Sequence, residues 1–223
     1  MPRINVLLTS ELSAGMGPFR HDGLEVVFHR WSSGAELPLL DGMVWAFVDW
    51  TGGDVNGLEL CRRLRCNPLT ARAHITMVLD NADPDSSRRA LRNGADDCVA
   101  GPIDRVHILD RILALRFQED DAASSRIIRH GDLTIDSAAA QACWQGKPIN
   151  LMPNELRLLR YFLEHPGQVF TRSQIIEALG KDGSVEEQTV NVWIGRLRRA
   201  LRKAKAGDPL RTVRSFGYVF DAG

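Results

Sequence analysis

The chain lacks long hydrophobic runs, and this absence narrows the class of protein to which it belongs. No apolar run approaches the roughly 18 residues that a membrane-spanning helix requires. The first residues, MPRINVLLTSELSAGMG, also lack the long apolar region of a signal peptide. We therefore expect a cytoplasmic protein with no membrane partner.

Cysteine and histidine are too few, and too scattered, to indicate a metal or disulfide site. The four cysteines cannot form a disulfide scaffold in 223 residues, and Cys61 and Cys66 lack a second Cys/His pair to complete a zinc site. The six histidines stand in no recognisable motif. Because a Gly-rich phosphate loop and a Ser–His–Asp spacing are also missing, the sequence predicts reduced thiols, no metal, no cofactor and no enzymatic activity.

The net charge of zero conceals two halves of opposite sign. Residues 1–123 contain 13 Lys/Arg and 18 Asp/Glu, a net charge of −5. Residues 124–223 contain 15 Lys/Arg and 10 Asp/Glu, a net charge of +5. Opposite signs indicate two domains with different partners, and the basic half is the candidate for nucleic acid.

The first half has the pattern of a parallel sheet wrapped by helices. Segments with helical spacing, such as 57–65 and 104–117, lie between short apolar runs at 4–8, 24–28, 43–48, 75–79 and 98–100. This alternation predicts an α/β fold with five parallel strands and helices on both faces. Asp49 follows the third run, at the carboxyl end of a strand, where such sheets bind ligands.

A polar stretch at 117–126 is the best candidate for a linker, because the pattern changes after it. Short strands are expected within 126–136 and 140–151. Helices and a final hairpin should follow, with boundaries set by Pro, Gly and capping residues: 153–167, 171–179, 184–205 and 210–220.

The helix expected at 184–205 has the features of a DNA-binding element. Its apolar stripe, which should face the core, consists of Val190, Ile194, Leu197 and Leu201. From Arg196 to Lys205 there are six basic residues and no acid, a run that repels itself unless an anion neutralises it. The helix also carries amide side chains that can contact base edges, and an α-helix fits the major groove. In the hairpin, Arg211 and Arg214 could reach the DNA backbone or the minor groove.

Nearly the whole chain resembles a response regulator of the OmpR/PhoB type. EEQTVNVWIGRLRRAL (186–201) resembles the recognition helix of that family, and LRTVRSFGYVF (210–220) resembles its wing. The resemblance implies a receiver domain at 1–116, a linker at 117–126 and an α+β winged-helix DNA-binding domain at 127–223. The receiver would have a flavodoxin-like, doubly wound five-stranded parallel sheet.

The same resemblance implies which side chains contact DNA. Tyr218 would support the wing. Asn191 stands where the family often has Asp, and Gly195 where it often has Arg. The basic run adds Arg199 and Arg202 as further contacts. The base or phosphate contacts that the resemblance implies are Gln188, Thr189, Asn191, Val192, Trp193, Arg196, Arg198, Thr212 and Arg214.

The receiver half matches the family in layout but not in chemistry. VDWTGGDVNG keeps the phosphoacceptor at Asp49, but Thr9 and Ser10 occupy the positions of the two acids that hold magnesium. Asp80, or Leu79 if the loop is one residue shorter, replaces the Thr/Ser that binds the phosphoryl oxygen. Gly101 stands where the family has a Lys before the Pro, and Cys98 replaces the aromatic residue that reports the switch.

These replacements remove the cations that phosphoryl transfer requires. Magnesium needs several hard oxygen ligands, and the transferred group needs positive charge around it. We therefore interpret Asp49 as the retained acceptor of an inactive, degenerate pocket whose other members are Thr9, Ser10, Asp80 and Gly101.

The family pairs its receivers through the fourth helix, fifth strand and fifth helix. Charges of both signs on one face can pair reciprocally across a two-fold axis. The residues predicted for such a homodimer are Arg88, Arg92, Asp96, Asp97, Asp110 and Arg111.

The leading hypothesis is a sequence-specific, DNA-binding bacterial transcription regulator that works without phosphorylation. Its partners would be promoter DNA, a second copy of the chain and RNA polymerase. Three alternatives remain open: a phosphorylation-dependent regulator in which Asp49 is the acceptor and Glu11 a substitute ligand, an enzyme on a flavodoxin-like sheet, and a receiver that sequesters another protein.

Overall fold

The computed structural model describes residues 3–9, 17–21, 24–32, 35–38, 40–51, 55–81, 83–120, 127–137, 141–180 and 187–221. The chain divides into two compact units, Met1–Leu109 and Asp110–Gly223. None of the described helices is long and apolar enough to cross a membrane.

The first unit contains the predicted parallel sheet and one additional strand. Each of the five predicted apolar runs forms a parallel strand: β1 (Arg3–Leu8), β3 (Leu24–Arg30), β4 (Met43–Asp49), β5 (His74–Leu79) and β6 (Asp97–Ala100). The short strand β2 (Phe19–His21) pairs with β3 in the antiparallel direction. The order in the sheet is β2-β3-β1-β4-β5-β6.

The connections on either side of β3 differ from the prediction of regular alternation with helices. Among the described residues between Leu8 and Met43, none is helical. Gly17–Pro18 and Pro38 stand in these connections, and both residue types oppose a helix interior. Because β2 also joins the sheet in the antiparallel direction, the prediction of five purely parallel strands is corrected to six strands of mixed direction.

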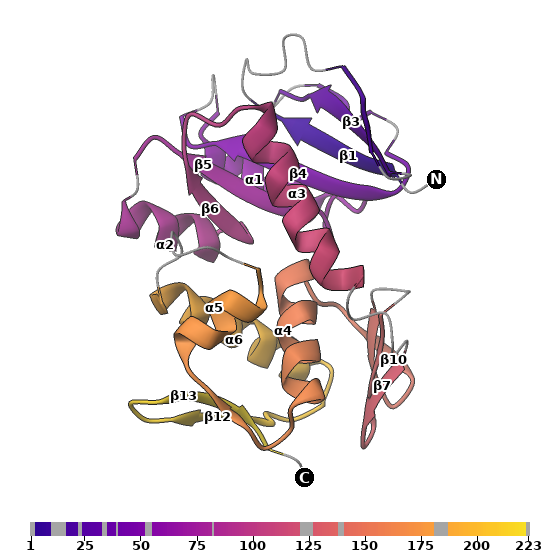
Figure 1. Ribbon diagram of the computed structural model, residues 1–223, viewed down its shortest axis with the longest axis vertical. Coiled ribbons are helices and arrows are strands. Elements are labelled where there is room, and N and C mark those ends of the chain that lie inside the picture. Colours follow the sequence, from indigo (N-terminus) through magenta and orange to yellow (C-terminus); the bar gives the residue numbers. More distant parts are fainter. Residues whose placement is uncertain are drawn as a thin grey trace. The chain divides into compact units, whose positions relative to one another are not determined.

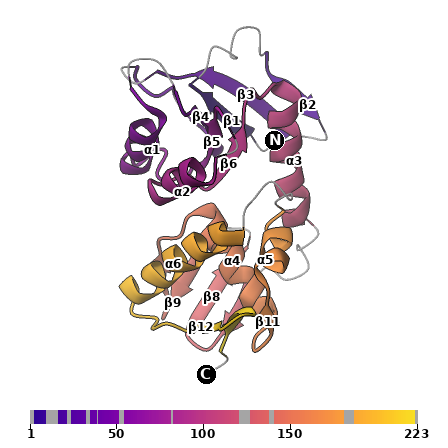
Figure 2. The ribbon, with the colours of Figure 1, turned by 90° about the vertical axis from the view of Figure 1, so that its left-hand side faces the viewer.

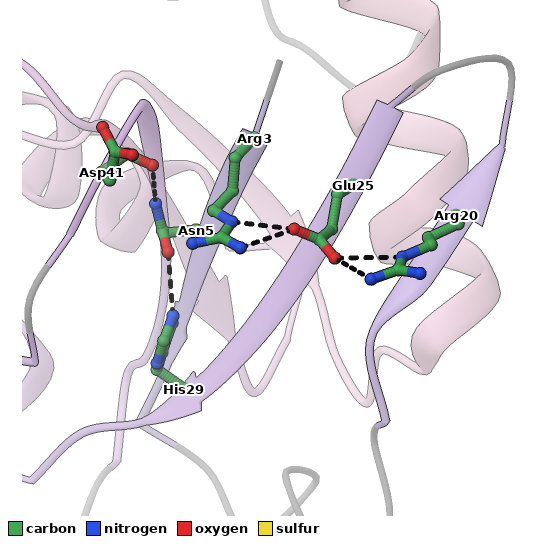
Figure 3. A network of polar contacts seen from close by, with 6 residues as sticks. All are labelled: Arg3, Asn5, Arg20, Glu25, His29 and Asp41. Atoms are coloured by element: carbon green, nitrogen blue, oxygen red, sulfur yellow. Dashed lines mark hydrogen bonds and ion pairs between the residues drawn. The ribbon is translucent and has the colours of Figure 1, made fainter. Parts of the chain in front are cut away.

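Polar contacts hold the additional strand against the sheet (Figure 3). The carboxylate of Glu25 on β3 accepts hydrogen bonds from Arg3 on β1 at 2.7 and 2.9 Å and from Arg20 on β2 at 2.7 and 3.0 Å. The bonds from Arg20, and then from Arg3, lower the pKa of Glu25 below its ordinary value. Beside them, the amide of Asn5 contacts His29 at 2.9 Å and the carbonyl of Asp41 at 2.7 Å.

Among the described residues, three helices cover the sheet of the first unit, and the last of them continues past Leu109 into the second unit. Helices α1 (Gly57–Cys66) and α2 (Pro84–Arg92) lie on one face, and α3 (Arg105–Asp120) lies on the other (Figures 1 and 2). Asn56 and Asp83 cap the first two by accepting hydrogen bonds from backbone N–H groups in the first turn. Helix α3 continues to Asp120, so the first four residues of the predicted linker are helical.

Among its described residues, the second unit contains two small sheets and three helices besides the end of α3 (Figure 1). The antiparallel order β10-β9-β8-β7 joins Lys147–Ile149, Gln141–Trp144, Leu133–Asp136 and Ile127–His130. The second sheet, β11-β13-β12, joins Val169–Phe170, Gly217–Phe220 and Leu210–Val213. The helices are α4 (Pro153–Glu164), α5 (Arg172–Ala178) and α6 (Glu187–Lys203), as the boundary signals predict.

One apolar core holds the second unit together. Phe162 from α4, Ile175 from α5 and Trp193 from α6 are fully buried in it, together with Phe220 from the β12–β13 hairpin. This packing fixes the outward face of α6 and the hairpin that follows it.

Candidate functional site

A threonine faces Asp49 at the carboxyl end of the parallel sheet. Asp49 ends β4, and Thr9 follows the neighbouring strand β1. The Thr9 hydroxyl donates to Asp49 Oδ2 at 3.1 Å and accepts the backbone N–H of Asp49 at 2.9 Å. A neutral hydroxyl therefore occupies part of the surface that a metal ion or a phosphoryl group would need on this carboxylate.

A second carboxylate stands at the end of the next strand. Asp80 follows β5, is exposed, and accepts hydrogen bonds from the Thr51 hydroxyl at 3.0 and 3.2 Å. Leu79 is 2% exposed in the apolar core, so Asp80 is the residue that reaches the strand end. A carboxylate here would repel a bound phosphoryl group rather than donate a hydrogen bond to it.

The end of β6 supplies no side chain to this region. Gly101 donates its N–H to Leu79 O at 2.8 Å, and an added Cβ would lie 2.9 Å from Val78 Cγ1. Ser10 and Glu11 lie outside the described residues. Among the residues that are described, no three His, Cys, Asp or Glu side chains gather as a metal site.

Helix α6 divides into a buried and an exposed face, and two predicted DNA contacts lie on the buried one. Trp193 is 0% exposed and Thr189 is 8% exposed. Trp193 packs in the core beside Val190 and Ile194, so its predicted contact with DNA is wrong, and Thr189 offers little surface to a base edge. The exposed and half-buried side chains of the helix include Gln188, Asn191, Val192, Arg196, Arg198, Arg199 and Arg202.

Arg198 ties α6 to the β12–β13 hairpin. Its guanidinium donates to Leu210 O at 2.7 and 3.2 Å and to the Thr212 hydroxyl at 3.0 Å, and it pairs with Asp208 at 3.3 Å. The protein itself thus engages most of the donors of Arg198, and the side chain sets the position of the hairpin relative to the helix.

Tyr218 joins the hairpin to α5 and α6. Its hydroxyl donates to Asn191 Oδ1 at 2.6 Å, and Arg172 Nε donates to the same oxygen at 3.1 Å. The guanidinium groups of Arg172 and Arg198 lie 5.5 and 5.8 Å from the centre of the Tyr218 ring. With the neutral Asn191 where the family often has Asp, the positive charge of this network is left available to an anion.

The hairpin turns at Arg214, Ser215 and Phe216, which are all exposed. Arg211 lies on its first strand and forms an ion pair with Asp221 at 2.9 Å. This pair occupies the Arg211 side chain, whereas Arg214 stands in the turn itself.

Comparison with known proteins agrees with this geometry. Residues 146–220 match the family model described as "Transcriptional regulatory protein, C terminal". The chain is 34% identical over 221 residues to the phosphate regulon transcriptional regulatory protein PhoB of Rhizobium meliloti, covering 98% of this chain and 94% of PhoB. The chain belongs to the OmpR/PhoB family of response regulators.

Other known proteins also match most or all of this chain. The response regulator MprA of Mycobacterium bovis is 34% identical over 206 residues, covering 89% of this chain and 84% of MprA. A solved variant of RitR covers 100% of both chains at a TM-score of 0.65 and 18% identity, which indicates a shared fold. The fold is thus that of an α/β receiver followed by a C-terminal winged-helix DNA-binding domain. Helix α6 and the β12–β13 hairpin occupy the segments whose sequences resemble the recognition helix and the wing of the family.

Two residues predicted for receiver dimerisation are buried. Asp96 is 0% exposed, pairs with Arg65 and accepts the N–H of Ile75 at 2.8 Å. Asp97 is 1% exposed, and its Oδ1 accepts the N–H of Cys98 at 2.9 Å. Both carboxylates belong to the interior of the receiver, so their predicted contact with a second copy is wrong.

The other residues predicted for dimerisation lie on α2 and α3. Arg92 and Asp110 are exposed, Arg88 and Arg111 are half-buried, and Arg88 pairs with Asp85 in the same helix at 2.9 Å.

The sequence does not point to Arg172 as a functional residue, because its contacts with Asn191 and Tyr218 join three separate elements of the winged-helix domain.

Proposed function

We propose that this OmpR/PhoB-type DNA-binding response regulator controls transcription without phosphorylation and uses its receiver as a pairing module. The main support is the contact between Thr9 and Asp49, because the acceptor carboxylate is held by a hydroxyl where the family has magnesium-binding acids. The Lys-to-Gly replacement at position 101 removes the other expected cation, and Asp80 adds negative charge.

We propose that DNA binding rests on the exposed face of α6 and on the wing turn. Gln188, Asn191, Val192 and Arg196 would face the major groove, since they lie on or beside the exposed face. Arg199 and Arg202 would neutralise phosphates, and Arg214 would reach the adjacent groove or backbone. Arg198 and Thr212 contribute by holding the wing against the helix.

Replacement of Arg196 or Arg214 by alanine tests this assignment. If the side chain touches a base, the variant should weaken specific DNA binding by about 1–3 kcal/mol. If the side chain touches a phosphate, the affinity of the variant should depend less steeply on salt than that of the wild type. Affinity would be measured by fluorescence anisotropy over a series of salt concentrations. The matched control is Arg129→Ala, an exposed arginine on β7 in the other sheet. Wild-type affinity in both test variants would contradict the assignment.

Pairing of receivers is expected to depend on the charges of α2 and α3. Arg88 and Arg92 on α2, and Asp110 and Arg111 on α3, place charges of both signs on the two helices that flank the edge strand β6. An arginine of one copy could therefore pair with Asp110 of the other across a two-fold axis. Arg111→Glu should weaken the dimer, measured as a lower mass by light scattering at micromolar concentration. Arg62→Glu, an exposed arginine on α1, is the control. An unchanged mass for Arg111→Glu would rule out this surface.

A further inference from the structure

The tip of the wing presents an aromatic ring to solvent. Phe216 is 65% exposed, an unusual state for a phenylalanine in a hairpin turn of only three residues. Exposure of this ring brings no gain in folding free energy, because its apolar surface remains in water.

The wing holds this ring in a defined position. The N–H of Phe216 donates to Val213 O at 3.1 Å, and Ser215 adopts a φ of +63°, which closes the turn. At the base of the turn, Gly217 lies so close to β11 that an added Cβ would collide with Phe170 O. The base is therefore packed against β11 while the Phe216 ring projects from the tip.

The surroundings of the ring favour a polyanion as its partner. Arg214 is exposed two residues before it, and Arg198 links Thr212 on the same wing to the recognition helix. A cation beside an exposed apolar ring suits the minor groove of a duplex, where the cation can contact phosphate and the ring can press between base steps.

We propose that Phe216 is an apolar wedge that enters the minor groove beside Arg214 and bends the bound duplex. This role rests on the proposed DNA-binding function, and it adds a contact that is independent of charge. Binding through Phe216 should therefore contribute to affinity and to DNA shape without contributing to salt dependence.

The test uses the full chain and a duplex selected by the wild-type protein from a random-sequence library. Phe216→Ala should lower affinity roughly tenfold. It should also reduce the bend, measured by energy transfer between dyes on the two duplex ends, and leave the slope of affinity against salt unchanged. Phe216→Leu should keep most of the affinity. Arg214→Ala should instead reduce the salt slope by about one. The thermal midpoint of Phe216→Ala should match that of the wild type, because the ring is exposed.

Three outcomes distinguish this role from the proposed function. Wild-type affinity and bend in Phe216→Ala, with weakened binding in Arg196→Ala, would overturn the wedge and leave the DNA-binding assignment standing. A straight duplex in the wild-type complex would also overturn the wedge. If the wild-type protein selects no duplex, the proposed function fails and the wedge fails with it.

Discussion

Replacement of Trp193 by alanine is expected to lower the free energy of unfolding of the winged-helix domain by about 3–5 kcal/mol. The indole is 0% exposed and packs among residues from all three helices of the domain, including Leu158, Ile175 and Leu197. Its removal leaves a cavity that the neighbouring side chains can fill only in part. Urea unfolding followed by circular dichroism would measure the loss.

The control for Trp193→Ala is Gln188→Ala, on the exposed face of the same helix. We expect this variant to keep the stability of the wild type within about 0.5 kcal/mol, as most surface substitutions do. If Trp193→Ala were as stable as the wild type yet lost DNA affinity, Trp193 would have to be a direct DNA contact after all.

Replacement of Arg65 by alanine should destabilise the receiver by about 3–5 kcal/mol, because it leaves a buried carboxylate without its cation. The Arg65 side chain is 12% exposed and pairs with the fully buried Asp96. Its guanidinium also donates to the carbonyls of Gly94 at 2.8 Å and Ala73 at 2.6 Å. One side chain thus joins α1 to the segments before β5 and β6.

Arg62→Ala provides the comparison for Arg65→Ala on the same helix. Arg62 is exposed and pairs with Glu59 at 3.3 Å, so its loss should cost about 0–1 kcal/mol. Thermal unfolding of both variants beside the wild type would measure the difference. Equal midpoints for the two variants would show that the burial of Asp96 does not depend on Arg65. Asp96 would then again be a candidate for contact with a second receiver.

The strands and helices that form the two cores follow directly from residue patterns. Each predicted parallel strand is an apolar run bounded by polar or turn residues, and the stripe of α6 through Val190 and Leu201 is buried as its spacing predicts. The short strand β2 was not predicted, because three residues are too few to show the apolar run or the alternation that predicts a strand. Its side-chain contact with β3 joins residues of different strands, because Glu25 on β3 binds both Arg20 on β2 and Arg3 on β1.

Individual site residues were harder to predict than the fold. Trp193 lies next to the apolar stripe of α6, and the family resemblance assigned it to DNA although its ring fills the core. Asp96 and Asp97 are adjacent acids, a pattern that predicts solvent exposure. Asp96 is buried because it pairs with Arg65, which lies 31 residues away in sequence and reaches it only in the folded receiver. The link between Arg198 and the wing likewise exists only once α6 and β12 are packed together.

The most direct test of a phosphorylation-independent receiver is a titration of the full chain with magnesium and then beryllofluoride, a phosphoryl mimic, followed by tryptophan fluorescence. Trp50 adjoins Asp49 and lies under the guanidinium of Arg89 on α2, 5.4 Å from the ring centre, so it should report a change in this pocket. Asp49→Ala is the control. We predict no saturable change in the wild type, and unchanged DNA affinity in Asp49→Ala. A saturable change that Asp49→Ala abolishes would contradict the account and restore Asp49 as a working phosphoacceptor.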